Sequence, residues 1–199
     1  MKKLIVICMM ASLITVAGAT TIQYTTGTPD FFGWTWKSAA VRFTVPADST
    51  YRLDALDMCV IGKPDTVKLN ITVWSDAAGP AGSPMFVLAE QDWHESFGMA
   101  WNHFDLSFAN LEFAPGTSFY AGYTTNAVNY ADVGIFEDSH ATSGRSSGIN
   151  IHYGSNWTDM GGELYFKTDV TAVPEPVTIA LLALGSMAIV RPRTKTKQE

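Results

Sequence analysis

Cysteine is almost absent from this sequence. The chain of 199 residues contains only Cys8 and Cys59. Because Cys8 lies in an N-terminal apolar segment that we expect to be removed, no intramolecular disulfide can form, and core packing must hold the domain together. Cys59 lies in the apolar run YRLDALDMCVIG, which predicts a buried, inert thiol rather than a reactive one.

Basic residues are scarce in the central part of the chain. Between Thr20 and Pro176, seven basic residues stand against 18 acidic ones, a net charge of about −11, whereas the whole chain carries −6. Nucleic-acid binding requires a basic patch that can neutralise phosphates. The composition therefore argues against nucleic acid as a partner.

A helical apolar repeat is also missing between the two ends. Instead, nine short runs rich in β-branched and aromatic residues are separated by turn sequences such as GKPD and APGT. These runs cover residues 39–45, 51–62, 67–76, 85–90, 101–113, 118–125, 132–138, 148–154 and 163–170. The pattern predicts an all-β domain over residues 20–171, an antiparallel β-sandwich of jelly-roll type with about 9–10 strands.

Strict alternation predicts which side chains share a face. The odd-numbered residues of 67–73 are all apolar and share one face, whereas Trp74 falls on the opposite, polar face. By the same rule, Phe108 shares the face of Phe104 and Leu106.

The N-terminus has the three parts of a secretory signal peptide. Lys2 and Lys3 supply positive charge, Leu4 to Val16 is apolar, and the sequence from Ala17 to Ala19 matches an A-x-A cleavage site. We expect residues 1–19 to form a signal helix, to engage the Sec export machinery and to be cut off after Ala19.

The C-terminus combines a proline motif, an apolar segment and basic residues. Residues 177–190 are fourteen residues without a charge. As a helix they would reach roughly 21 Å, short of a hydrocarbon core of about 30 Å. The tail 191–199 carries four basic residues, Arg191, Arg193, Lys195 and Lys197, which the positive-inside rule would keep in the cytoplasm.

This order of parts resembles the PEP-CTERM sorting domains, which are exosortase substrates. The resemblance rests on residues 172–199: the motif Val173, Pro174, Glu175 and Pro176, then the apolar transmembrane segment, then the basic tail. It implies transient anchoring in the inner membrane of a Gram-negative bacterium, cleavage at the motif, and delivery to the cell surface or its polysaccharide matrix. The alternative is a plain, stably inserted C-terminal membrane anchor.

The central domain also resembles uncharacterised jelly-roll-like modules found before sorting tails. The resemblance is carried by the segments GTPDFFGW, AVRFTV, YRLDAL, ITVWSDAAGPAGSP, WNHFDLS and FYAGYTT. It brings no established activity with it.

Motifs for catalysis are weak. His94, Glu95 and His103 lack the spacing of a zinc site such as HExxH, so we interpret them as surface-loop residues. Residues 144–148, GRSSG, match G-x-S-x-G, but no helix follows to form a nucleophile elbow. We therefore expect a non-enzymatic protein.

Two binding functions remain open. Asp30, Glu137 and Asp138 are loop carboxylates that could bind a structural Ca²⁺; no other cofactor is indicated.

Trp34, Trp74, Trp93 and Trp157 could contact exopolysaccharide as exposed platforms, or could instead close the ends of a small sandwich. The alternative function is a secreted polysaccharide hydrolase, which would need an exposed groove with two facing carboxylates.

Overall fold

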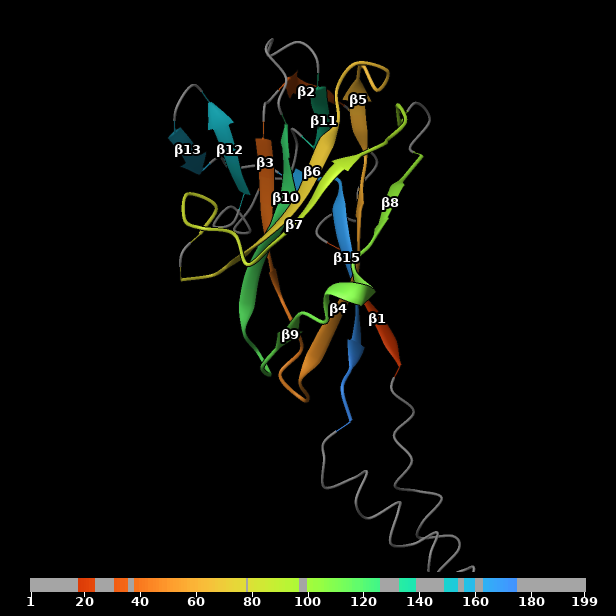
Figure 1. The fold of residues 1–199 in the computed structure, drawn as a ribbon. Coiled ribbons are helices and arrows are strands. Elements are labelled where there is room, and N and C mark those ends of the chain that lie inside the picture. Colours follow the sequence, from red (N-terminus) through yellow and green to blue (C-terminus); the bar gives the residue numbers. More distant parts are fainter. Residues whose placement is uncertain are drawn as a thin grey trace, which may run out of the picture.

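The computed structural model describes residues 18–23, 31–35, 38–77, 79–96, 100–125, 133–138, 149–153, 156–159 and 163–174. Over these residues the protein is all-β, with 15 strands and one 3₁₀ turn (Figure 1). The elements are β1 (Ala19–Gln23), β2 (Phe31–Thr35), β3 (Ser38–Thr44), β4 (Tyr51–Met58), β5 (Val60–Gly62), β6 (Leu69–Ser75), β7 (Phe86–Gln91), β8 (Asn102–Asp105), η1 (Ser107–Ala109), β9 (Glu112–Phe113), β10 (Ser118–Thr125), β11 (Val133–Asp138), β12 (Ile149–Tyr153), β13 (Asn156–Asp159), β14 (Glu163–Leu164) and β15 (Phe166–Ala172).

The larger main sheet, here called sheet C, has the strand order β13-β12-β3-β10-β6-β7, and all its pairs are antiparallel. One of its two central strands is β10, which pairs with β3 on one side and β6 on the other. This strand carries no charge and is rich in aromatic residues, as expected for a strand flanked on both edges.

The second main sheet, sheet A, has the order β1-β15-β4-β8, with β9 also paired to β4. Its pairs are antiparallel too. The register of β15 on β4 shifts between Asp169 and Val170. Such a bulge lets Leu53 and Leu56 both face the core although two residues separate them.

A small sheet, sheet B, contains β14, β11 and β2, with β5 also paired to β11. Two of its strands continue strands of sheet A, since Cys59 alone separates β4 from β5 and Tyr165 alone separates β14 from β15. In Figure 1, β2, β5 and β11 lie at the end of the domain opposite the start of β1 and the end of β15.

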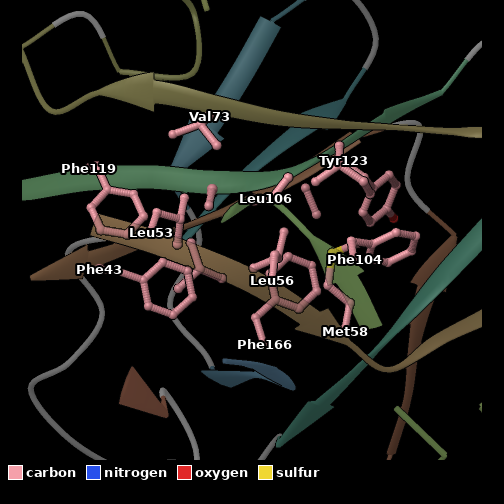
Figure 2. Packing of buried hydrophobic residues seen from close by; sticks show 14 of the residues in the cluster. Phe43, Leu53, Leu56, Met58, Val73, Phe104, Leu106, Phe119, Tyr123 and Phe166 are labelled. Atoms are coloured by element: carbon pink, nitrogen blue, oxygen red, sulfur yellow. The ribbon is translucent and has the colours of Figure 1, made fainter. Parts of the chain in front are cut away.

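The hydrophobic core lies between sheets A and C, which makes the domain a β-sandwich. Figure 2 shows Phe43 and Phe119 of sheet C facing Leu53 and Leu56 of sheet A. Phe119 stacks on Phe43 at a ring-centroid distance of 5.7 Å and on Phe113 at 4.2 Å. Offset aromatic pairs of this kind add about 0.5–1.5 kcal/mol each beyond the area that they bury.

The prediction of an all-β antiparallel domain is confirmed, but the predicted number of about 9–10 strands is wrong. Three predicted runs are each split in two, giving β4 and β5, β8 and β9, and β14 and β15. Strands β1, β2 and β13 were not predicted. The signal and sorting helices predicted at the two ends lie outside the described residues.

The predicted faces are confirmed for one run and wrong for part of another. Val67, Leu69, Ile71 and Val73 are all buried in the core cluster, as alternation predicts. Phe108, however, is exposed, because residues 107–109 form the turn η1 and the period of two is lost there.

Cys59 is buried, as predicted, and makes no disulfide. Its thiol packs with Tyr165, Ile61 and Trp101 in a small apolar cluster. Burial raises the pKa of the Cys59 thiol to about 12, which keeps it protonated at neutral pH.

Candidate functional site

Two of the predicted tryptophans meet on the outer face of sheet C. The rings of Trp74 and Trp157 have a centroid distance of 5.6 Å and an edge-to-face angle of 76°. They come from β6 and β13, which three other strands separate in the sheet. The contact therefore requires the sheet to curl, so that its β13 edge folds back over its own outer face.

Cross-strand pairing adds polar groups to this pair. Tyr120 lies opposite Trp74 on one side and opposite Arg42 on the other. Arg42 donates two hydrogen bonds to Asp76, from Nε at 2.5 Å and from an Nη atom at 2.7 Å. This hydrogen bonding by Arg42 lowers the pKa of Asp76.

We call these residues the outer patch of sheet C: Arg42, Trp74, Asp76, Tyr120 and Trp157. Its aromatic surface comes from Tyr120 and Trp157, since Trp74 is buried, and it lies beside a neutralised Arg–Asp pair. Such a surface can make apolar contacts and hydrogen bonds to the same ligand without contributing net charge.

Of the two alternatives for the tryptophans, an exposed platform does not apply to Trp74 or Trp93. Trp74 is 2 % exposed and Trp93 is 7 % exposed. Trp157 covers Trp74, and Trp93 belongs to the core cluster, where its Nε1–H donates to the carbonyl oxygen of Val67 at 2.8 Å. Trp157 is half-buried, and Trp34 lies on β2 with its side chain outside the described part.

The outer face of sheet A carries a second polar cluster that sequence reasoning missed. Asp57 lies opposite Lys167 of β15 and opposite His103 of β8. Its Oδ1 atom is 2.8 Å from Nδ1 of His103, and its Oδ2 atom is 3.8 Å from Nζ of Lys167. The same Lys167 ammonium group lies 4.7 Å from the ring centroid of Trp101.

This cluster corrects the interpretation of His103 as a loop residue. His103 lies on β8, and its side chain is solvent-exposed. Alternation in WNHFD could have indicated that His103 and Trp101 share a face, but the strands that supply Asp57 and Lys167 are far away in the sequence.

The segment around His94 is held by a buried amide. Asn102 accepts a hydrogen bond from the backbone N–H of His94 and donates one to its carbonyl oxygen, each at 2.8 Å. It also donates to Oγ of Ser96, which accepts from the N–H of Val60. The carboxylate of Glu95 accepts from the N–H of Gly62 at 3.3 Å. These contacts attach the loop to β5.

Two of the three proposed calcium ligands lie on a strand and not in a loop. Glu137 and Asp138 lie on β11, paired through the backbone with Leu164 and Glu163 of β14. Asp30 lies outside the described residues, although the residue after it, Phe31, is opposite Glu137. Within the part of the chain that the structure describes, no group of three or more His, Cys, Asp or Glu residues could hold a metal ion.

Most of the sorting signal lies outside the described residues, which end at Pro174. The residues of the sorting signal that lie outside are Glu175, Pro176, Arg191, Arg193, Lys195 and Lys197. At the other end, Ala17 of the predicted cleavage site also lies outside. Over the residues that are described, no helix has the length and apolar character needed to span a membrane. The GRSSG segment also lies outside them.

Comparison with known proteins leaves the family open. No family profile matches the chain, and no curated protein matches it. The chain is similar in structure to the VP2 subviral particle of infectious bursal disease virus, with a TM-score of 0.35 and 10 % identity, over 88 % of this chain and 49 % of that one. The T13 particle of that virus matches with a TM-score of 0.34 and 11 % identity, over 82 % of this chain and 41 % of that one. The chain thus spans half or less of these proteins.

Proposed function

We propose that this chain is an exported, non-enzymatic protein of the bacterial surface or extracellular matrix. It would leave the cytoplasm through the Sec machinery and be cleaved by an exosortase at the motif Val173 to Pro176. The order of proline motif, apolar segment and basic tail supports this, as does the signal-peptide pattern at the other end.

One observation carries the proposal: the two ends of the domain lie side by side. β1 pairs antiparallel with β15, with Ala19 opposite Thr171, so the chain enters and leaves at the same end of sheet A (Figure 1). A domain built in this way can stand on a membrane through either end. The predicted signal-peptide cut after Ala19 would remove only the first residue of β1.

The domain also holds the first residue of the motif. The N–H of Val173 donates to the carbonyl oxygen of Thr50 at 2.8 Å, whereas Pro174 is exposed. The motif thus begins as an extended continuation of β15, which is the backbone form that a protease-type cleft binds.

The test is the substitution of Pro174, Glu175 and Pro176 by alanine. We expect the precursor to accumulate in the inner membrane, while the unchanged protein reaches the surface without residues 191–199. The control replaces an exposed proline and an exposed glutamate elsewhere, Pro84→Ala with Glu112→Ala. Surface delivery of the motif variant would contradict the proposal, and intact mass showing the tail on exported protein would favour a plain anchor.

We further propose that the outer patch of sheet C contacts exopolysaccharide, on a sandwich of jelly-roll type. The hydrolase alternative needs a general acid with a raised pKa. Asp76 and Asp105 instead have lowered pKa values, Asp76 because Arg42 donates hydrogen bonds to it and Asp105 because the side chain and N–H of Ser107 do. Neither of these two carboxylates has the raised pKa that a general acid needs.

Affinity electrophoresis tests this contact. The exported protein should be retarded in gels that contain exopolysaccharide from the producing cells. Trp157→Ala should abolish the retardation, whereas Trp101→Ala should leave it unchanged, because Trp101 lies next to β8 of the other sheet. If the two substitutions had equal effects on the retardation, the outer patch would not be the contact surface.

A further inference from the structure

The edge strand β7 is the most apolar exposed part of the described surface. Three large hydrophobic side chains are strongly exposed there: Met85 by 49 %, Val87 by 44 % and Phe108 by 64 %. Met85 directly precedes β7 and Val87 lies on it, while Phe108 packs edge-to-face on Phe86 at a ring-centroid distance of 5.9 Å.

β7 is also an edge strand of sheet C. Among the described residues it pairs with β6 alone. Such a strand presents backbone N–H and C=O groups to a further strand unless lysine, proline or a bulge protects it. Residues 85–89 contain no charge and no proline, and the register on β6 is regular from Phe86 to Leu88. A bulge follows between Leu88 and Gln91, where Glu90 has a φ of 54°.

We propose that β7 is a self-association edge, at which two copies of this chain pair their β7 strands antiparallel. Charge supports a second copy as the partner. The region from Thr20 to Pro176 carries about −11, so two copies repel each other over most of their surfaces. Residues 85–89 carry no charge, so this part of the edge is a place where identical molecules can approach.

The two faces of β7 determine the register. Val87 and Ala89 face outward, whereas Phe86 and Leu88 pack against the core cluster. Residues directly opposite each other in an antiparallel pair point to the same face. Pairing Val87 with Val87 of the second copy satisfies this rule and places Phe86 opposite Leu88 of that copy. It is centred on the regular stretch from Phe86 to Leu88, which precedes the bulge.

This register makes the test specific. Val87→Lys places two ammonium groups opposite each other, and Val87→Glu places two carboxylates there, so each variant alone should weaken association by at least about tenfold. An equal mixture of the two variants should associate again, because lysine then faces glutamate. Val87 is partly exposed, so either side chain fits the folded monomer.

Sedimentation equilibrium of the exported protein measures the result at concentrations up to about 1 mM, the weak end of specific association. We expect a dimer mass for the unchanged protein, monomers for each variant alone, and dimers for their mixture. Thr44→Lys, an exposed change on β3 of the same sheet, is the control and should leave the dimer intact.

Monomeric unchanged protein over the whole concentration range would overturn the proposal. A dimer that Val87→Lys does not weaken would overturn it as well, because association would then use another surface. Neither outcome bears on the sorting tail, which the substitutions at Pro174 to Pro176 test separately.

Discussion

Gly122 lies against Ala39 so closely that no side chain could stand between them. A Cβ at Gly122 would be 1.9 Å from the carbonyl oxygen of Ala39 and 2.6 Å from Cα of Ala40. These atoms belong to the backbone of β3, the neighbour of β10 in sheet C. Backbone cannot rotate away, so the two strands require glycine at this position.

Gly122→Ala should therefore lower the free energy of unfolding by about 3 kcal/mol or more, since overpacking next to backbone cannot relax. Urea unfolding followed by circular dichroism measures the change. Gly79→Ala is the control: its Cβ would meet nothing within 4 Å, and only its φ of 59° opposes the substitution. That cost should be about 1–2 kcal/mol. Equal losses for both variants would contradict the close approach.

Thr168 offers a stabilising substitution. Its hydroxyl is fully buried on β15 and has no hydrogen-bond partner among the described residues. Valine has the same shape without the polar group, so Thr168→Val should raise the free energy of unfolding by about 1–2 kcal/mol. Thr72→Val is the matched control, because the buried hydroxyl of Thr72 donates to the carbonyl oxygen of Asn70 at 3.1 Å. If Thr168→Val destabilises the protein as much as the control does, its hydroxyl is satisfied.

The Cys59 thiol should be inert in the folded protein. With a pKa of about 12, only about one part in ten thousand is thiolate at pH 8, and the side chain is also buried. Iodoacetamide should therefore label Cys59 only after unfolding in urea, as read from peptide masses. Rapid labelling under native conditions would show that the cluster around Trp101 opens.

Acid should weaken the Arg42–Asp76 pair. Hydrogen bonds from Arg42 hold the pKa of Asp76 below its ordinary value of 3.8, so the folded state binds the proton less tightly than the unfolded chain. The contribution of the pair to the free energy of unfolding is complete above pH 3.8 and is lost as the pH falls through the lowered pKa of Asp76. With side chains 35 % and 39 % exposed, the pair contributes only about 0.5 kcal/mol.

An NMR titration of the Asp76 carboxyl carbon tests this shift. In Arg42→Gln the pKa of Asp76 should rise towards its ordinary value, whereas Arg52→Gln, which removes a partner of Asp54, should leave it unchanged. An unaltered titration in Arg42→Gln would show that another group lowers the pKa.

Some elements could be predicted to the residue. The run SFYAGYTT is β10, Ser118–Thr125, with the predicted bounds. The turn sequence APGT precedes it directly, and its aromatic and small residues suit a strand with neighbours on both edges. The buried row from Val67 to Val73 followed in the same way from alternation.

Other features needed distant partners. The run from Tyr51 to Gly62 looks like one strand, yet it divides at Cys59 because β4 pairs in sheet A while β5 pairs with β11. Nothing in the local sequence marks this change of sheet. Asp57 likewise gives no sign that Lys167 and His103 will flank it.

The sequence by itself determined an acidic, disulfide-free, all-β domain, because composition and a period of two depend only on neighbouring residues. The tertiary structure alone decided which side chains are accessible. Alternation predicts that Trp74 points away from the core, and it does so. Trp74 is nevertheless buried, because the curl of sheet C brings Trp157 over it. Burial of that kind depends on contacts between strands far apart in the chain, and a local sequence pattern cannot predict such contacts.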